Sequence, residues 1–96
     1  MYVRVVSGRY SQDASPDEVT RLTEEHLVPA LQRLPGFQSY WGGYDAETFT
    51  VIGLTAFDTQ EHANYSREQV AAGLAPLYQA GMQLDPPRVY EITVQA

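Results

Sequence analysis

The chain has 96 residues, a formal net charge of -6 at pH 7 and no cysteine. This length predicts one domain over residues 1–96. The chain has no lysine and only scattered arginines, which argues against nucleic acid and anionic membranes as partners. Without cysteine, disulfides and thiolate chemistry are excluded. No signal peptide or membrane-spanning run is found, which predicts a cytoplasmic protein.

The first predicted strand spans Tyr2–Tyr10, where β-branched residues are frequent. Side chains alternate between the two faces of a strand, so Val3 and Val5 are expected on one face and Arg4 on the other. A short polar loop at Ser11–Ala14 ends this strand.

The next segment predicts a helix from Ser15 to about Leu34. Ser15 can cap the helix, and Glu18 completes a capping box. Apolar residues then recur at helical spacing. Pro29 interrupts the pattern, and because proline removes a backbone donor, we expect a kink or a restart there.

Two further strands are predicted at Gln38–Tyr44 and Thr48–Phe57, joined by a turn at Asp45–Glu47. The third strand carries apolar groups on both faces, as expected if both faces are covered. The alternation of the second strand separates its side chains into two sets: Phe37, Ser39 and Trp41 on one face, and Gln38, Tyr40 and Tyr44 on the other.

Asp58 and Thr59 are both competent caps, and a second helical region over Gln60–Ala72 is predicted after them. Gly73 and Pro76 disfavour a single long helix, so two pieces joined near Gly73 are expected. The last predicted strand spans Arg88–Val94.

This order, β-α-β-β-α-β, predicts an α+β fold with a ferredoxin-like antiparallel sheet. Two helices can cover only one face of such a sheet. The other face has to be covered by another apolar surface, because a large exposed apolar patch is rare on a soluble monomer. A homodimer is therefore expected.

Few residues suggest chemistry, and no known cofactor-binding motif is present, so no cofactor is expected. His26 lies on or beside the apolar stripe of the first helix and could act as an acid or base near neutral pH. The alternative is a hydrogen-bonded or half-exposed helix histidine. His62 is expected at the surface, and two such distant histidines do not suggest a metal site.

Aromatic residues concentrate on the central hairpin. They could form a pocket for a flat aromatic molecule, or they could be sheet core or dimer interface. Arg67, in the second helical region, could hold a phenolate or carboxylate, or form an exposed salt bridge. The predicted substrate-binding residues are Trp41, Tyr44, Phe57 and Tyr65.

Together with the order of the segments, three stretches resemble the antibiotic biosynthesis monooxygenase family of the dimeric α/β-barrel superfamily. They are His26–Leu31, Leu34–Phe37 and Asp58–Glu61. The resemblance implies a homodimer with a pocket between sheet and helices in each protomer. It also implies oxidation of quinol-type or polyketide molecules by dioxygen without metal or flavin.

Heme-degrading members of the family use an asparagine, a tryptophan and a histidine. Here Ser7, Phe57 and Arg67 stand near those places, which disfavours heme degradation. The leading hypothesis is a cofactor-independent monooxygenase acting on a small aromatic or quinol-type molecule, with His26 as the base. The alternatives are a catalytically silent small-molecule-binding or dimerisation module, and a cofactor-free isomerase or cyclase.

Overall fold

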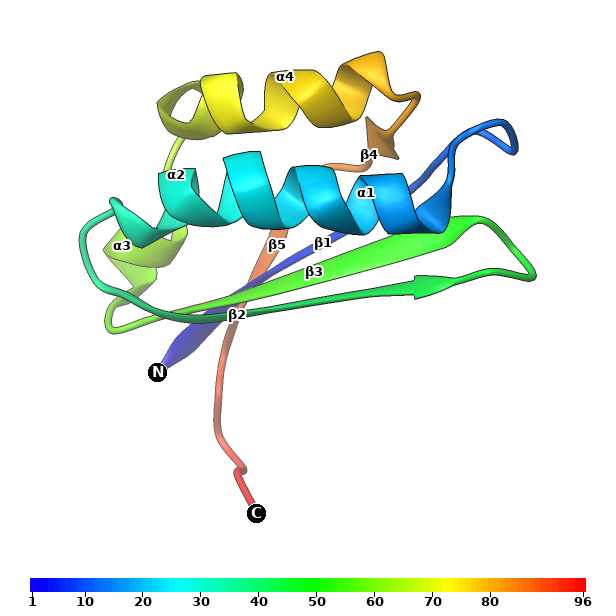
Figure 1. Cartoon of the computed structure of the whole chain (residues 1–96). Helices are drawn as coiled ribbons and strands as arrows, with labels where there is room; N and C mark the ends of the chain where they lie inside the picture. The colour runs from blue at the N-terminus through cyan, green and yellow to red at the C-terminus, as the bar shows by residue number, and fades with distance from the viewer.

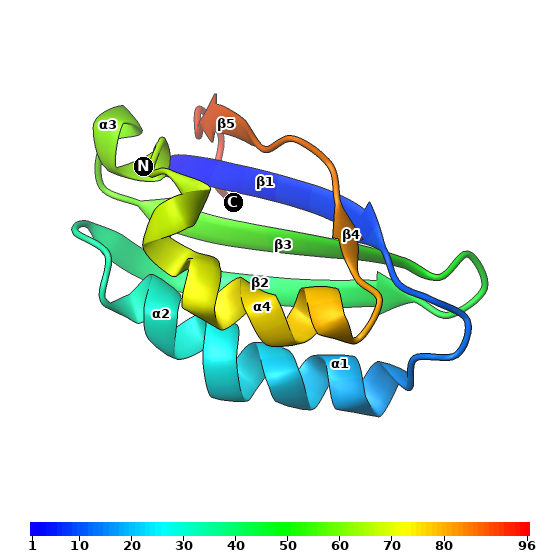
Figure 2. The ribbon, with the colours of Figure 1, turned by 90° about the horizontal axis from the view of Figure 1, so that it is seen from above.

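The computed structural model describes residues 1–96 as two layers, with the helices on one face of a five-stranded antiparallel sheet (Figures 1 and 2). The strand order is β2-β3-β1, with β4 and β5 sharing the outer edge of β1. The predicted ferredoxin-like α+β fold is confirmed. In chain order, the elements are β1 (Tyr2–Arg9), α1 (Pro16–Leu22), η1 (Thr23–Leu27), α2 (Val28–Gln32), β2 (Phe37–Asp45), β3 (Thr50–Phe57), α3 (Gln60–Ala63), η2 (Arg67–Val70), α4 (Ala71–Gln79), β4 (Gln83–Leu84) and β5 (Arg88–Glu91).

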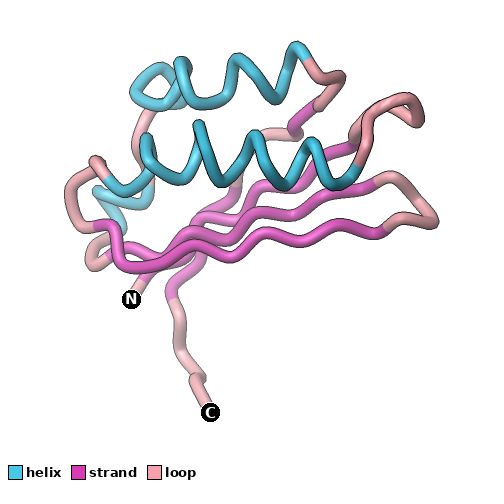
Figure 3. Tube along the Cα trace, viewed as in Figure 1, coloured by secondary structure: helices cyan, strands magenta, loops and turns pink.

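The first helix neither breaks nor restarts at Pro29. It runs without interruption through α1, η1 and α2, as Figure 3 shows. The segment η1, which ends two residues before Pro29, is a π-helical turn in which the Val28 N–H donates to the carbonyl of Thr23. Proline cannot donate to the carbonyl four residues earlier, and a wider turn is one way in which a helix adapts to this loss.

The second helical region is interrupted earlier than predicted. The break lies at residues 64–66, and a capping box between Ser66 and Gln69 starts the next helical segment. Gly73 and Pro76 both lie inside α4. The prediction of a joint near Gly73 was therefore wrong, because the capping signal at Ser66 outweighs the low helix propensity of glycine.

Gly73 instead permits close packing between α4 and the first helix. A Cβ atom at this position would stand 2.7 Å from the His26 carbonyl oxygen and 3.0 Å from the Ala30 Cβ. Any larger residue would push the two helices apart, so this glycine sets the geometry of the helical layer.

At the start of β2, the side chain of Phe37 lies on the opposite face of the sheet from the one predicted. A bulge between Phe37 and Ser39 inserts one extra residue, and Phe37 pairs with Phe57. The ring centroids of Phe37 and Phe57 lie 6.4 Å apart in an edge-to-face arrangement on the helix side. Phe37 therefore shares a face with Tyr40 rather than with Trp41, since a shift of one residue moves a side chain to the other face.

The last strand is shorter than predicted, because β5 ends at Glu91. A two-residue strand, β4, pairs with the far end of β1 and was not predicted. Pro86 and Pro87 lie between the two strands and cannot donate to a ladder, which separates the edge into two short pieces. None of the helices is both long and apolar enough to cross a bilayer.

Replacing Gly36 by alanine is expected to lower the free energy of unfolding by about 1–3 kcal/mol. Gly36 has a φ of 76°, and a Cβ there would collide with Asp58 Oδ1 and His62 Nδ1. Those two atoms are themselves 2.6 Å apart, and this hydrogen bond holds the pKa of Asp58 below its usual range.

Urea unfolding followed by circular dichroism measures the effect. Gly43→Ala is the matched control, because its new methyl group would lie 3.6 Å from Ile52 Cγ2, an ordinary contact. A loss of stability in Gly36→Ala no larger than that in Gly43→Ala would contradict the prediction.

Candidate functional site

A cavity of about 780 Å³ lies between the helical layer and the sheet. This volume is within the range of small-molecule sites. Of the 28 residues that line it, 16 are hydrophobic. Such a lining favours a largely apolar ligand, and the position of the cavity is the one that the family resemblance implies.

The apolar part of the cavity comes from both layers. The first helix contributes Leu27 and Leu31, and α4 contributes Leu74. The sheet contributes Val6 and Val51 from the helix-facing positions of β1 and β3. These positions face inward because alternate residues of a strand share a face, so the strand pattern positions the cavity floor.

Arg4 supplies a buried positive charge in the cavity wall. It lies on the helix-facing side of β1 and is only 5% exposed. Its Nη1 donates to the carbonyl oxygens of Ala63 at 3.1 Å and Tyr65 at 2.8 Å. Its guanidinium carbon lies 3.9 Å from the centre of the Tyr65 ring. Burial lowers the pKa of Arg4, because desolvation disfavours the charged form.

Tyr40 lies across a pair of glycines in neighbouring strands. Gly42 pairs with Gly53, and a Cβ on either would stand 3.0 Å or 3.2 Å, respectively, from the Tyr40 hydroxyl. The two glycines thus leave space for the Tyr40 ring. Burial raises the pKa of Tyr40, and interaction with Tyr65 raises it further. Tyr40 is therefore a neutral hydrogen-bond donor at pH 7.

The stability of the fold is expected to fall as the pH rises through the alkaline range. Burial also raises the pKa of Tyr65, so both phenols ionise later in the folded chain than at their ordinary value of 10.0. A raised folded-state pKa contributes stability that is present below the unfolded pKa and lost as the pH rises toward the folded pKa.

Urea unfolding from about pH 9 to about pH 12 measures this loss, with tyrosinate absorbance reporting ionisation. Tyr40→Phe should flatten the decline. The exposed Tyr78→Phe is the control and should leave the decline unchanged. A profile of Tyr40→Phe that follows that of the wild type would contradict a buried, late-ionising Tyr40.

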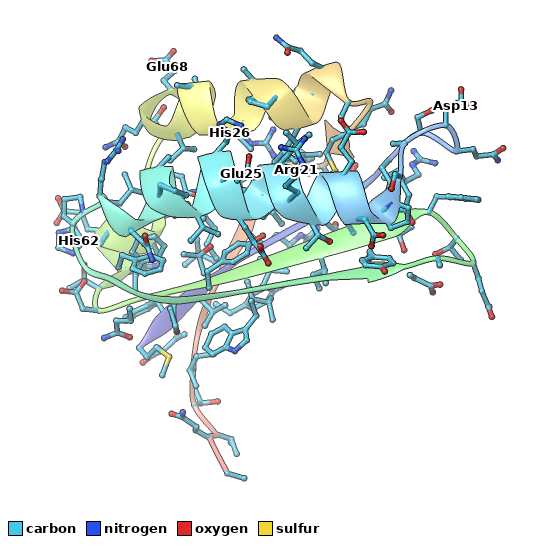
Figure 4. The ribbon with its side chains drawn as sticks, in the orientation of Figure 1. Asp13, Arg21, Glu25, His26, His62 and Glu68 are labelled. Carbon is cyan, nitrogen blue, oxygen red and sulfur yellow. The ribbon has the colours of Figure 1, made fainter.

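His26 does not reach the cavity. Its side chain is exposed and projects from the first helix on the side away from the sheet (Figure 4). It is also absent from the cavity lining, to which its helical neighbours Thr23 and Leu27 contribute. Adjacent residues of a helix point about 100° apart, so Leu27 occupies the inner face that His26 was expected to share. The structure gives no support to His26 as the base in this cavity.

The predicted aromatic residues do not form one pocket. Tyr44 and Tyr65 line the cavity. Trp41 lies on the opposite face of the sheet and is 56% exposed. Phe57 is fully buried in the core and contacts no cavity space. The correction for Trp41 follows from strand alternation, because Tyr40, its neighbour, occupies the helix side.

Arg4 was missed as a site residue, and Tyr40, one of the hairpin aromatic residues, was not among the predicted substrate-binding residues. A signal was present for Arg4, since strand alternation placed a charged residue on a face that otherwise carries apolar groups. No group of three or more histidine, cysteine, aspartate or glutamate side chains is close enough to hold a metal ion.

No family profile and no curated protein matches this sequence significantly. Several solved structures share the fold. A variant of SnoaB, a cofactor-independent oxygenase from Streptomyces nogalater, has a TM-score of 0.70 and 12% identity, over 98% of this chain and 94% of its own. A Nitrosomonas europaea protein named after the antibiotic biosynthesis monooxygenases has a TM-score of 0.73 and 16% identity, over 98% and 100%.

A third neighbour is an uncharacterised NIPSNAP domain protein from Burkholderia xenovorans. It has a TM-score of 0.66 and 14% identity, over 100% of this chain and 98% of its own. The chain therefore has the ferredoxin-like fold of the antibiotic biosynthesis monooxygenase structures, and the expected resemblance is confirmed at the level of the fold. Since proteins with other names share this fold, the fold alone does not define the function.

Proposed function

We propose that this protein is a cofactor-independent monooxygenase that oxidises a small aromatic or quinol-type molecule in the cavity between sheet and helices. The observation that supports the proposal is the combination of a large, mostly apolar cavity with a buried arginine and three phenols in its wall. The fold shared with a cofactor-independent oxygenase adds support.

In this proposal, the substrate loses a proton to solvent as it enters the cavity, and the resulting anion itself reduces dioxygen. The positive charge of Arg4 favours the substrate anion over the neutral form, and the Tyr40 hydroxyl can donate to its oxygen. For a methylene group between aromatic rings, one oxygen atom becomes the new carbonyl and the other leaves as water with the two hydrogens. The apolar lining excludes bulk water from the reactive anion.

Oxygen uptake with a panel of hydroquinones and anthrone-like phenols tests the proposal. We expect uptake above the buffer rate, and a decrease in kcat of about tenfold or more in Tyr40→Phe, because one donor to the developing anion is lost. His26→Ala, outside the cavity, should retain wild-type turnover.

Two results would contradict the proposal. Product formation under strict anaerobiosis would indicate the isomerase or cyclase alternative. Binding of the aromatic compounds by folded protein without any turnover would indicate a catalytically silent binding module.

We also propose that a second copy of the chain covers the open face of the sheet. The helices lie on the other face, and the C-terminal residues after β5 extend on the open side (Figure 1). The open face carries Trp41, Ile52 and Tyr90, each about half exposed, on β2, β3 and β5. An apolar patch of this kind, spread over neighbouring strands, supports a self-complementary interface.

A further inference from the structure

The charges in the cavity wall differ from those of the whole chain. The chain has a formal net charge of -6, whereas the lining contains two arginines, Arg4 and Arg67, and one carboxylate, Glu24. The ion pairs of the molecule join Arg21 to glutamates on its own helix and His62 to Asp58. Neither cavity arginine has a carboxylate partner.

Arg4 retains donors that the protein does not use. Its Nη1 donates to the backbone carbonyls of Ala63 and Tyr65 and so stabilises the chain at the end of α3. Its Nε is buried and has no hydrogen-bond partner. A buried donor without an acceptor is costly, so an acceptor from a bound molecule would stabilise it. The Nε side of a guanidinium is also an edge that can bind a carboxylate in a bidentate manner.

Arg67 brings a second positive charge to the same region. It starts the segment η2, lines the cavity and donates from Nη2 to the backbone carbonyl of Asp85. The positive charge of Arg67 also contributes to the lowered pKa of Arg4, as expected for two nearby cations. Two cations close together in a partly buried wall are stabilised by an anion between them.

We infer that the ligand of this cavity is an aromatic carboxylate whose carboxylate group binds Arg4 and Arg67 while its rings occupy the apolar part. This inference rests on the proposed function in one respect only, namely that the cavity binds an aromatic molecule. It adds a permanent negative charge, distinct from the reacting phenol, that selects the substrate and fixes its orientation.

Calorimetric titration at pH 7 and low ionic strength tests the inference with two probes of equal shape, 2-naphthoate and 2-naphthamide. We expect the carboxylate to bind at least about tenfold more tightly than the neutral amide. Arg67→Gln should remove most of this preference, because it weakens binding of the carboxylate far more than binding of the amide. Arg33→Gln is the matched control, because Arg33 is exposed and lies outside the cavity lining.

Each outcome has a distinct meaning. Equal affinity for the two probes overturns the carboxylate site but leaves the aromatic cavity of the proposed function intact. If Arg67→Gln and Arg33→Gln lose the preference for the carboxylate to the same extent, the site is also overturned, since the preference would then reflect the overall charge of the protein. If neither probe binds, the inference fails, whereas the proposed function is decided separately by oxygen uptake with the hydroquinones and anthrone-like phenols. The half-buried Arg67 is chosen over Arg4 because its replacement does not leave the Ala63 and Tyr65 carbonyls without a donor.

Discussion

Replacing Phe57 by alanine is expected to lower the free energy of unfolding by about 3–5 kcal/mol. Phe57 is 0% exposed and ends β3 beneath the helical layer. Its ring centroid lies 6.4 Å from that of Phe37 and 5.6 Å from that of Tyr65. The truncation would leave a cavity between two rings, Phe37 on β2 and Tyr65 in the connection between α3 and η2, so the surroundings could not easily collapse into it.

Urea unfolding monitored by circular dichroism measures the change in the free energy of unfolding. Tyr78→Ala is the control, because Tyr78 is an aromatic residue that is exposed on α4, and its loss should change stability by less than about 1 kcal/mol. A similarly small change in Phe57→Ala would show that Phe57 does not anchor the core. The variant should also weaken ligand binding, since the Tyr65 ring, which lines the cavity, packs against both Phe57 and the guanidinium of Arg4.

Replacing Trp41 by aspartate is expected to convert the proposed dimer into a monomer, with the dissociation constant raised at least about a hundredfold. Trp41 is the largest exposed side chain of the open face, and its partner in the neighbouring strand β3 is Leu54. The substitution removes an aromatic anchor and places a charge where a partner would have to bury it. Because the side chain lies away from the helices, the fold of the single chain should persist.

Sedimentation equilibrium at micromolar concentration measures the change. The wild type should sediment at twice the 10.7 kDa mass of the chain. Gln12→Asp adds the same charge in an exposed loop away from the sheet and should remain dimeric. A wild-type protein that sediments as a monomer would refute the second copy as the cover of the open face, as would a Trp41→Asp variant that remains dimeric.

Local patterns determined much of the fold. The Ser15 cap is present, with its side chain accepting from the Glu18 N–H. Gly36 has the positive φ that glycine commonly adopts after a helix. The faces of Val3, Val5 and Arg4 follow from alternation, since the pleat of a strand imposes a period of two residues. These features depend on neighbours in sequence, and such features can be read from a sequence alone.

Tertiary structure decided which residues meet at the cavity. The bulge at the start of β2 moved Phe37 to the helix side, and the phase of the first helix turned His26 outward. The pairing of Gly42 with Gly53, which leaves space for Tyr40, depends on the register of two strands. Arg4 meets the carbonyls of Ala63 and Tyr65, about 60 residues later in the chain. Register, helix phase and long-range contacts are set by the packing of whole layers, so the site emerges only when the layers assemble.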